Sequence, residues 1–153
     1  MPYLQKDDYT ISIPIEHLNE VLAEGIIDSG KTDDQVRETA EQWAIDIYTW
    51  FVQGRYDIAV EFAKISPDTA RKIVVINCIV DLALYQIHTI SPRNIPAWVQ
   101  KNYDQCIEML KMIADGSMDL VGVPEVENPI AGTELKSNCK FISKPFTDSS
   151  LQV

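Results

Sequence analysis

The stretch IVVINCIVDLALYQI, Ile73–Ile87, is the longest apolar run in the chain, and only Asn77 and Asp81 interrupt it. Its β-branched residues also permit a strand, but its length without a turn residue favours a helix. The preceding motif SPDT, residues 66–69, suits a helix start, because serine caps helices and proline fits the first helical position. We therefore predict a helix over residues 66–90 that is apolar nearly all round and lies buried at the centre of the fold.

The segment before this central helix indicates a second, amphipathic helix. Thr32 and Gln35 have the spacing of a capping box, and Asp33 and Asp34 occupy the first turn, where the helix dipole favours anions. Gly54 follows the apolar residues and is expected to end the helix. The predicted buried stripe consists of Val36, Ala40, Trp43, Ala44, Ile47, Trp50 and Phe51.

Two more helices complete the prediction. Residues 14–24 carry apolar side chains at helical spacing and end at Gly25, after which IIDSGK, residues 26–31, is expected to form a turn. Residues 96–115 form the last helix, with Gly116 as its expected stop. The sequence therefore predicts an all-α fold: a compact bundle of four to five helices with a long central buried helix and an extended C-terminal arm.

The helical period is lost after Gly116. Residues 117–153 contain three prolines, two glycines and scattered single apolar residues. We therefore divide the chain into a helical domain, residues 1–116, and an extended arm, residues 117–153. The arm is expected to become ordered, and able to pair as strands, when it contacts a neighbouring subunit. The residues expected to grip that neighbour are Leu120, Val123, Val126, Ile130, Phe141 and Phe146.

Composition restricts the function classes. The 153 residues carry a formal net charge of −10, which disfavours nucleic-acid binding, because such binding depends largely on Lys and Arg contacts to phosphates. We expect neither a transmembrane helix nor a secretory signal. The three cysteines, Cys78, Cys106 and Cys139, form no CxxC pair and are expected to be reduced thiols.

Motifs for catalysis or metal binding are not found in the sequence. It has no phosphate-binding loop motif. His17 and Glu20 could share one helix face, but two ligands do not make a metal site. His88 lies near the end of the buried helix and Cys106 in the apolar stripe of the last helix, where packed core residues are more common than a base or a nucleophile. We therefore predict no catalytic residue, no cofactor and no metal.

The stretch GRY, Gly54–Tyr56, places a large cation and an aromatic ring directly after a helix end. Asp81 is the only acid between residues 69 and 91, and an acid in an apolar helix is costly unless it is paired. Arginine offers a rigid fork that suits a carboxylate. We therefore predict a structural clamp made of Gly54, Arg55, Tyr56 and Asp81, in preference to a catalytic arginine.

The order of these motifs resembles a family of Mu-like prophage proteins. The shared features are Tyr3-Leu4 with Asp7-Asp8, then Gly54-Arg55-Tyr56, then Asp81–Tyr85, and a final motif that runs from Tyr103 to Leu120. The resemblance implies an all-helical head–tail connector, or adaptor, of a tailed phage. Two departures are local: a proline-containing loop often follows GRY in relatives and is missing here, and the tail past Leu120 is longer than the family core.

The resemblance also implies a structural role. Such connectors are virion proteins at the head–tail interface, assembled in the host cytoplasm, and they are not enzymes. They form homo-oligomeric rings, usually twelvefold, that contact the portal protein and tail or stopper proteins, while DNA passes through the lumen without specific binding. No membrane is involved. The residues themselves leave two alternatives open: an acidic interaction module, such as a DNA mimic or inhibitor, and a small enzyme built around Arg55, Asp81 and His88.

Overall fold

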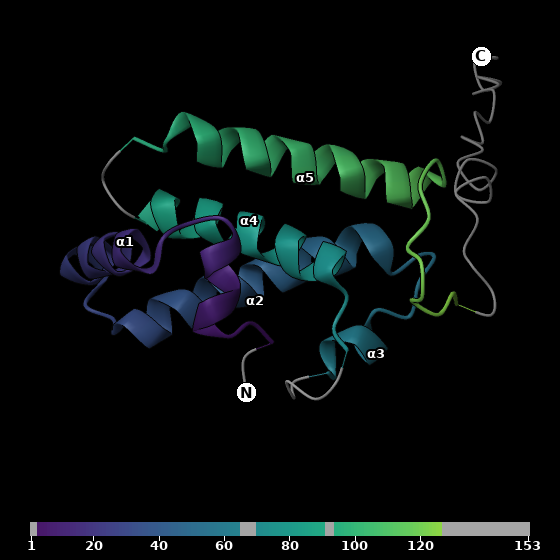
Figure 1. Ribbon diagram of the computed structural model, residues 1–153, viewed down its shortest axis with the longest axis horizontal. Coiled ribbons are helices and arrows are strands. Elements are labelled where there is room, and N and C mark those ends of the chain that lie inside the picture. The colour runs from purple at the N-terminus through teal and green to yellow at the C-terminus, as the bar shows by residue number, and fades with distance from the viewer. Residues whose placement is uncertain (1–2, 65–69, 91–93, 127–153) are drawn as a thin grey trace, which may run out of the picture.

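The computed structural model describes residues 3–64, 70–90 and 94–126, with the backbone alone for residues 24–29 (Figure 1). These residues form an all-α fold, as predicted, in which no strand is present within the described ranges. The elements in chain order are the 3₁₀ helix η1 (Lys6–Ile11) and the α-helices α1 (Ile15–Ser29), α2 (Asp33–Val52), α3 (Ala59–Phe62), α4 (Ile73–Ile90) and α5 (Ala97–Asp115).

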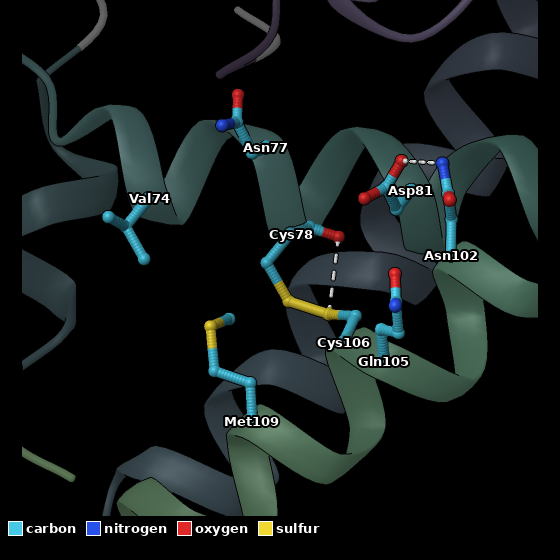
Figure 2. A pocket seen from close by; sticks show the side chains of 8 residues that line it. All are labelled: Val74, Asn77, Cys78, Asp81, Asn102, Gln105, Cys106 and Met109. Atoms are coloured by element: carbon cyan, nitrogen blue, oxygen red, sulfur yellow. Dashed lines mark hydrogen bonds between the residues drawn. A yellow bond between two sulfur atoms is a disulfide. The ribbon is translucent and has the colours of Figure 1, made fainter.

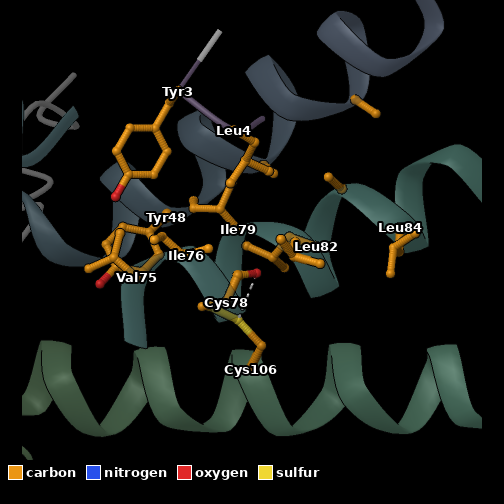
Figure 3. Close-up of a cluster of buried hydrophobic side chains, with 14 of the residues drawn as sticks. Tyr3, Leu4, Tyr48, Val75, Ile76, Cys78, Ile79, Leu82, Leu84 and Cys106 are labelled. Carbon is orange, nitrogen blue, oxygen red and sulfur yellow. Dashed lines mark hydrogen bonds between the residues drawn. A yellow bond between two sulfur atoms is a disulfide. The ribbon is translucent and has the colours of Figure 1, made fainter. Parts of the chain in front are cut away.

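The predicted central helix is α4. It packs against α2, α5, α1 and η1, and Figure 1 shows it between α5 on one side and α2 on the other. Its length and composition alone would also allow it to cross a membrane, but core helices of folded domains share those properties. Here most of its side chains are buried and join the main hydrophobic cluster (Figure 3). The buried residues of α4 are Val75, Ile76, Cys78, Ile79, Val80, Leu82, Ala83, Leu84, Ile87 and His88.

The start of α4 lies later than predicted. The sequence indicated a helix from Ser66, but Ala70–Lys72 are not helical and α4 begins at Ile73. Tertiary contacts explain the difference: the backbone N–H of Lys72 donates to the Glu61 carboxylate, and the Arg71 side chain binds Asp8. The predicted cap at Ser66 lies outside the described residues.

The N-terminus of α2 agrees with the prediction, whereas its buried face differs. The reciprocal hydrogen bonds of the capping box between Thr32 and Gln35 are both present. However, the helix presents Tyr48 and Val52 to the core, and Trp50 remains 68% exposed. The predicted stripe was too wide because it followed apolar character alone. The fully buried residues recur every four positions and are Val36, Ala40, Ala44, Tyr48 and Val52.

The glycines predicted to end α1 and α5 behave differently. α1 continues through Gly25 to Ser29, and Gly30 follows with φ +66°, so the turn predicted over residues 26–31 is wrong for its first part. At the end of α5, Gly116 adopts φ +88°, the left-handed conformation typical of a helix stop. The prediction for Gly116 is therefore confirmed.

Part of the predicted arm belongs to the helical domain. Leu120 is 7% exposed and Val123 is 6% exposed, and both belong to the main core cluster. Residues 117–126 thus fold back onto the helices of their own chain, and the hydrophobic core continues past residue 116. The predicted arm residues Ile130, Phe141 and Phe146 lie outside the described residues.

Candidate functional site

The GRY segment fastens the end of α2 to the end of α5. Arg55 Nη1 donates to the carbonyl oxygens of Ile113, at 2.8 Å, and Met118, at 3.3 Å. Its Nη2 donates to Asp119 Oδ1 at 2.9 Å, and this hydrogen bond raises the pKa of the Arg55 guanidinium. The arginine therefore satisfies a carbonyl in the last turn of α5, where a helix leaves its carbonyl groups without partners.

Tyr56 continues the same clamp. Its hydroxyl accepts a hydrogen bond from the backbone N–H of Leu120 at 3.0 Å and donates to Asp119 Oδ1 at 3.4 Å. The Arg55 guanidinium lies over the Tyr56 ring, 5.2 Å from its centroid. Tyr56 also forms an isolated antiparallel bridge with Glu125. The GRY segment thus holds the whole described loop after α5.

Asp81 is not part of this clamp, so the predicted Arg55–Asp81 pair is wrong. Asp81 Oδ1 accepts hydrogen bonds from Ser12 Oγ, at 3.0 Å, and Asn102 Nδ2, at 3.2 Å. Arg55 instead contacts Ile113, which lies eleven residues after Asn102 on α5. That separation is about 16 Å along a helix, too far for a direct ion pair. Burial raises the pKa of the Asp81 carboxyl, while the two hydrogen bonds oppose the rise.

A second group of polar contacts holds the N-terminal segment, and the sequence analysis missed it. Arg71 binds Asp8 through two hydrogen bonds of 2.8 and 3.1 Å and donates a third to the carbonyl oxygen of Tyr3. The Tyr3 hydroxyl donates to Glu61 at 3.2 Å. Burial would raise the pKa of Glu61, but Lys64 and the backbone N–H of Lys72 outweigh it, and the pKa is lowered. The Tyr3-Leu4 and Asp7-Asp8 motifs gave the only sequence signal for these contacts.

Cys78 and Cys106 form a disulfide between α4 and α5, which corrects the prediction of reduced thiols. Their Cα atoms lie 5.7 Å apart, within the ordinary range for a disulfide. Both side chains are buried. The prediction failed because it relied on the absence of a CxxC motif, whereas the pairing depends on two helices that face each other. Cys139 lies outside the described residues.

A groove runs between α4 and α5 beside this disulfide (Figure 2). Its volume is about 220 Å³, and its lining combines amide and carboxyl groups with two apolar side chains. Asn77 Oδ1 is buried and has no hydrogen bond to the described residues, but Figure 2 shows that the Asn77 amide points away from α5. The residues that line the groove are Val74, Asn77, Cys78, Asp81, Asn102, Gln105, Cys106 and Met109.

An apolar pocket of about 250 Å³ adjoins the groove, with Val74 common to both linings. Ile73, Val74, Met118 and Val121 are exposed at 58%, 42%, 37% and 88% around it. Lys72 lies at its edge. The N-terminal turn of α4 and the loop after α5 therefore present a cluster of apolar side chains to the surroundings.

The histidines do not form a site. His17 is exposed on α1. His88 is buried, its Nδ1 lies 2.8 Å from the carbonyl oxygen of Leu84, and its ring packs edge-on near Trp98. Within the described part of the chain, no cluster of three or more potential metal ligands exists. The structure also keeps Arg55 and Asp81 in separate hydrogen-bond networks, so it does not unite the three residues of the enzyme alternative.

Comparison with known proteins adds one finding. No curated protein and no solved structure matches the chain. The family described as "Bacteriophage Mu, Gp36" matches residues 3–137, which is most of the chain and includes the N-terminal contacts, the GRY clamp and all the described helices. The chain therefore belongs to the bacteriophage Mu Gp36 family of phage proteins.

Proposed function

We propose that this phage protein is a structural virion component, a head–tail connector that forms a ring below the portal. The observation that carries the proposal is the exposed apolar cluster of Ile73, Val74, Met118 and Val121 in a member of a phage family. Contiguous apolar side chains on a small domain typically mark a protein–protein interface.

The charge is consistent with this role. A net charge of −10 would give the ring an acidic lumen, through which DNA could pass without adhering. A closed ring needs a heterologous interface, in which one surface of a subunit meets a different surface of the next. The exposed cluster is a suitable half of such an interface, with the portal protein and a tail or stopper protein as further partners. The proposal assigns no catalytic activity and no cofactor.

Electron microscopy tests the proposal directly. Purified full-length protein is imaged in negative stain over a range of concentrations, alone and with the portal protein of the same phage. Rings on their own or stacked on the portal are the expected result. As a matched pair, Val121→Glu places a charge within the apolar cluster, and Lys111→Glu places it on the exposed surface of α5. We expect Val121→Glu to abolish rings and Lys111→Glu to retain them.

The opposite results have equally definite meanings. A protein that stays a small monomer or dimer at every concentration, and that ignores the portal, would contradict the connector role. Such behaviour would favour the acidic interaction module. Mass spectrometry of purified virions gives an independent measurement, since a connector must be found in particles at a fixed ratio to the portal.

A further inference from the structure

The Cys78–Cys106 disulfide joins two core helices of a protein that belongs to a phage family. A phage protein is synthesised in the cytoplasm of its host, where glutathione and thioredoxin keep thiols reduced. Both cysteines therefore begin as thiols, and the fold must accommodate the dithiol state as well as the disulfide.

The contact between α4 and α5 does not depend on the bond. Before Cys106 on α5, Asn102 donates a hydrogen bond to Asp81 on α4. After Cys106, the side chains of Leu110 and Ile113 are fully buried in the main core cluster. Since α5 is held on both sides of its cysteine, the dithiol protein is expected to keep the same fold.

The thiol form of Cys106 has a hydrogen-bond acceptor in place. Cys106 Sγ lies 3.6 Å from the main-chain carbonyl oxygen of Cys78, as the dashed line in Figure 2 shows. A disulfide sulfur carries no proton, so this contact is a hydrogen bond only when Cys106 is a thiol. The groove beside the bond also leaves room for the two sulfur atoms to move apart. The site therefore suits both redox states.

The bond is shielded from large molecules and open to small ones. Cys78 is 2% exposed and Cys106 is 4% exposed, so the active site of a protein oxidoreductase cannot reach the sulfur atoms. Both cysteines nevertheless line the α4–α5 groove, and Val74 and Gln105 of the same lining are exposed to solvent. Because thiol–disulfide exchange requires access to a sulfur atom, the groove gives that access to a small thiol such as glutathione.

The bond also fixes the two halves of the exposed apolar cluster relative to each other. Ile73 and Val74 belong to the first turn of α4, and Val74 shares a helix face with Cys78, four positions later. Met118 and Val121 belong to the loop that follows α5. A covalent link between the two helices therefore limits how far the two halves can shift.

We propose that Cys78 and Cys106 form a redox switch that small thiols and disulfides operate through the α4–α5 groove. In the reducing cytoplasm the pair is a dithiol, and α4 and α5 are joined by packing and hydrogen bonds alone. After release from the cell the disulfide forms and locks the apolar cluster in one arrangement. The proposal rests on membership of a phage family and does not depend on the connector role.

The chemistry is two successive exchange reactions with glutathione disulfide as the oxidant. The thiolate of one cysteine attacks a sulfur of glutathione disulfide, which breaks that bond, forms a mixed disulfide and releases one glutathione. The second cysteine then loses its proton and attacks the mixed disulfide, which forms the protein disulfide and releases the second glutathione. Two protein thiols are oxidised, and one glutathione disulfide is reduced to two molecules of glutathione.

Thiol counting tests the switch in full-length protein with Cys139→Ser, in which the pair contains the only remaining cysteines. Oxidised and reduced samples are equilibrated in anaerobic buffers of increasing glutathione disulfide, quenched with acid and alkylated, and mass spectrometry counts the free thiols. We expect both samples to converge, with the dithiol dominant at the cytoplasmic ratio of glutathione to its disulfide and the protein disulfide dominant in excess glutathione disulfide. A bond that persists at the cytoplasmic ratio, thiols that never pair, or samples that fail to converge would overturn the proposal.

A second measurement tests the route through the groove. Gln105→Trp places a large side chain at the edge of the groove, and Lys111→Trp is the matched control on the exposed surface of the same helix. We expect Gln105→Trp to slow reduction of the bond by excess glutathione by about ten-fold, because exchange depends on access, and Lys111→Trp to leave the rate unchanged. The melting temperatures of both variants show whether a change in stability accounts for the rates. Equal rates in the two variants would overturn the groove as the route of access.

Discussion

Arg55 shows how one side chain connects two helix ends. It donates to the main-chain carbonyls of Ile113 and Met118 as well as to the carboxylate of Asp119. The Asp119 side chain is 71% exposed, so that ion pair is screened by water and contributes little. The stabilising part of the clamp is therefore the pair of carbonyl contacts, which require the geometry of the guanidinium.

We expect Arg55→Ala to lower the free energy of unfolding by about 1–2 kcal/mol, because it removes a charge-assisted hydrogen bond to the part-buried carbonyl of Ile113 and a weaker, exposed one to Met118. Arg55→Lys should recover only part of this loss, since lysine lacks the planar fork. Urea denaturation measures the change. Asp119→Asn serves as the control and should stay close to wild type. An Asp119→Asn variant as unstable as Arg55→Ala would show that the carboxylate dominates the clamp.

Asp81 gives a pH-dependent prediction. Burial raises the pKa of its carboxyl above the value of about 3.9 found in unfolded chains. The folded protein therefore holds this proton more tightly than the unfolded chain does. The contribution of Asp81 to stability falls as the pH rises from the pKa of the unfolded chain through the higher pKa of the folded protein. The Asp81→Asn substitution removes this loss of stability. The amide oxygen of the asparagine can still accept hydrogen bonds from Ser12 and Asn102.

The difference in melting temperature between Asp81→Asn and wild type should therefore grow in favour of the variant from about pH 4 upward. At neutral pH the variant should be at least as stable as wild type. Thermal unfolding followed by circular dichroism across this range measures the effect. Asp104→Asn is the control, because it removes the same charge from an exposed position on α5. A variant that melts well below wild type at pH 7 would show that Asp81 has a cationic partner after all.

At the scale of the helices, Gly54 and Gly116 form a natural comparison. Both follow an amphipathic helix and were expected to end it. Gly116 has φ +88°, whereas Gly54 does not adopt a left-handed conformation, and a Cβ built there meets no atom within 4 Å. α2 instead ends at Val52, with Gln53 as its cap in the right-handed region.

We therefore expect Gly116→Ala to cost about 1–2 kcal/mol, because an L side chain is strained at this positive φ. Gly54→Ala should be neutral or slightly stabilising, since alanine restricts the unfolded chain. Chemical denaturation of the two variants side by side measures both effects. Similar losses in both would mean that Gly54 is needed for the turn as well.

The sequence predicted elements well where local chemistry dictates them. The Thr32 capping box and the Gly116 stop depend only on nearby residues, and both are confirmed. The later start of α4 depends on contacts such as that between Arg71 and Asp8, which are distant in sequence. The clamp was predicted in part: Gly54–Tyr56 was identified as a connecting point, but its partner Asp119 lies in a loop without periodicity.

At the scale of the molecule, the Cys78–Cys106 disulfide joins the central helix to α5. It closes a loop with a sequence separation of 28 residues, for which the chain-entropy relation gives about 3–4 kcal/mol as an upper range. We expect a reductant to lower the melting temperature of the oxidised protein by several degrees. Differential scanning calorimetry with and without the reductant measures the shift.

Two variants make this prediction specific. The double variant Cys78→Ser/Cys106→Ser should melt at the same temperature with and without reductant, whereas Cys139→Ser should respond like wild type. A wild-type protein whose melting temperature ignores the reductant, together with two free thiols by mass spectrometry at these positions, would show that the bond does not form in solution.

The exposure of Trp50 gives this protein a built-in optical probe. Trp50 is 68% exposed and packs edge-on against Phe51, whereas Trp43 is partly buried against the core. An indole in water emits at longer wavelength and collides freely with dissolved quenchers such as acrylamide. If subunits cover this end of α2 when they associate, emission should shift to the blue and quenching should fall as concentration rises. A Trp50→Phe variant would separate that signal from the two other tryptophans.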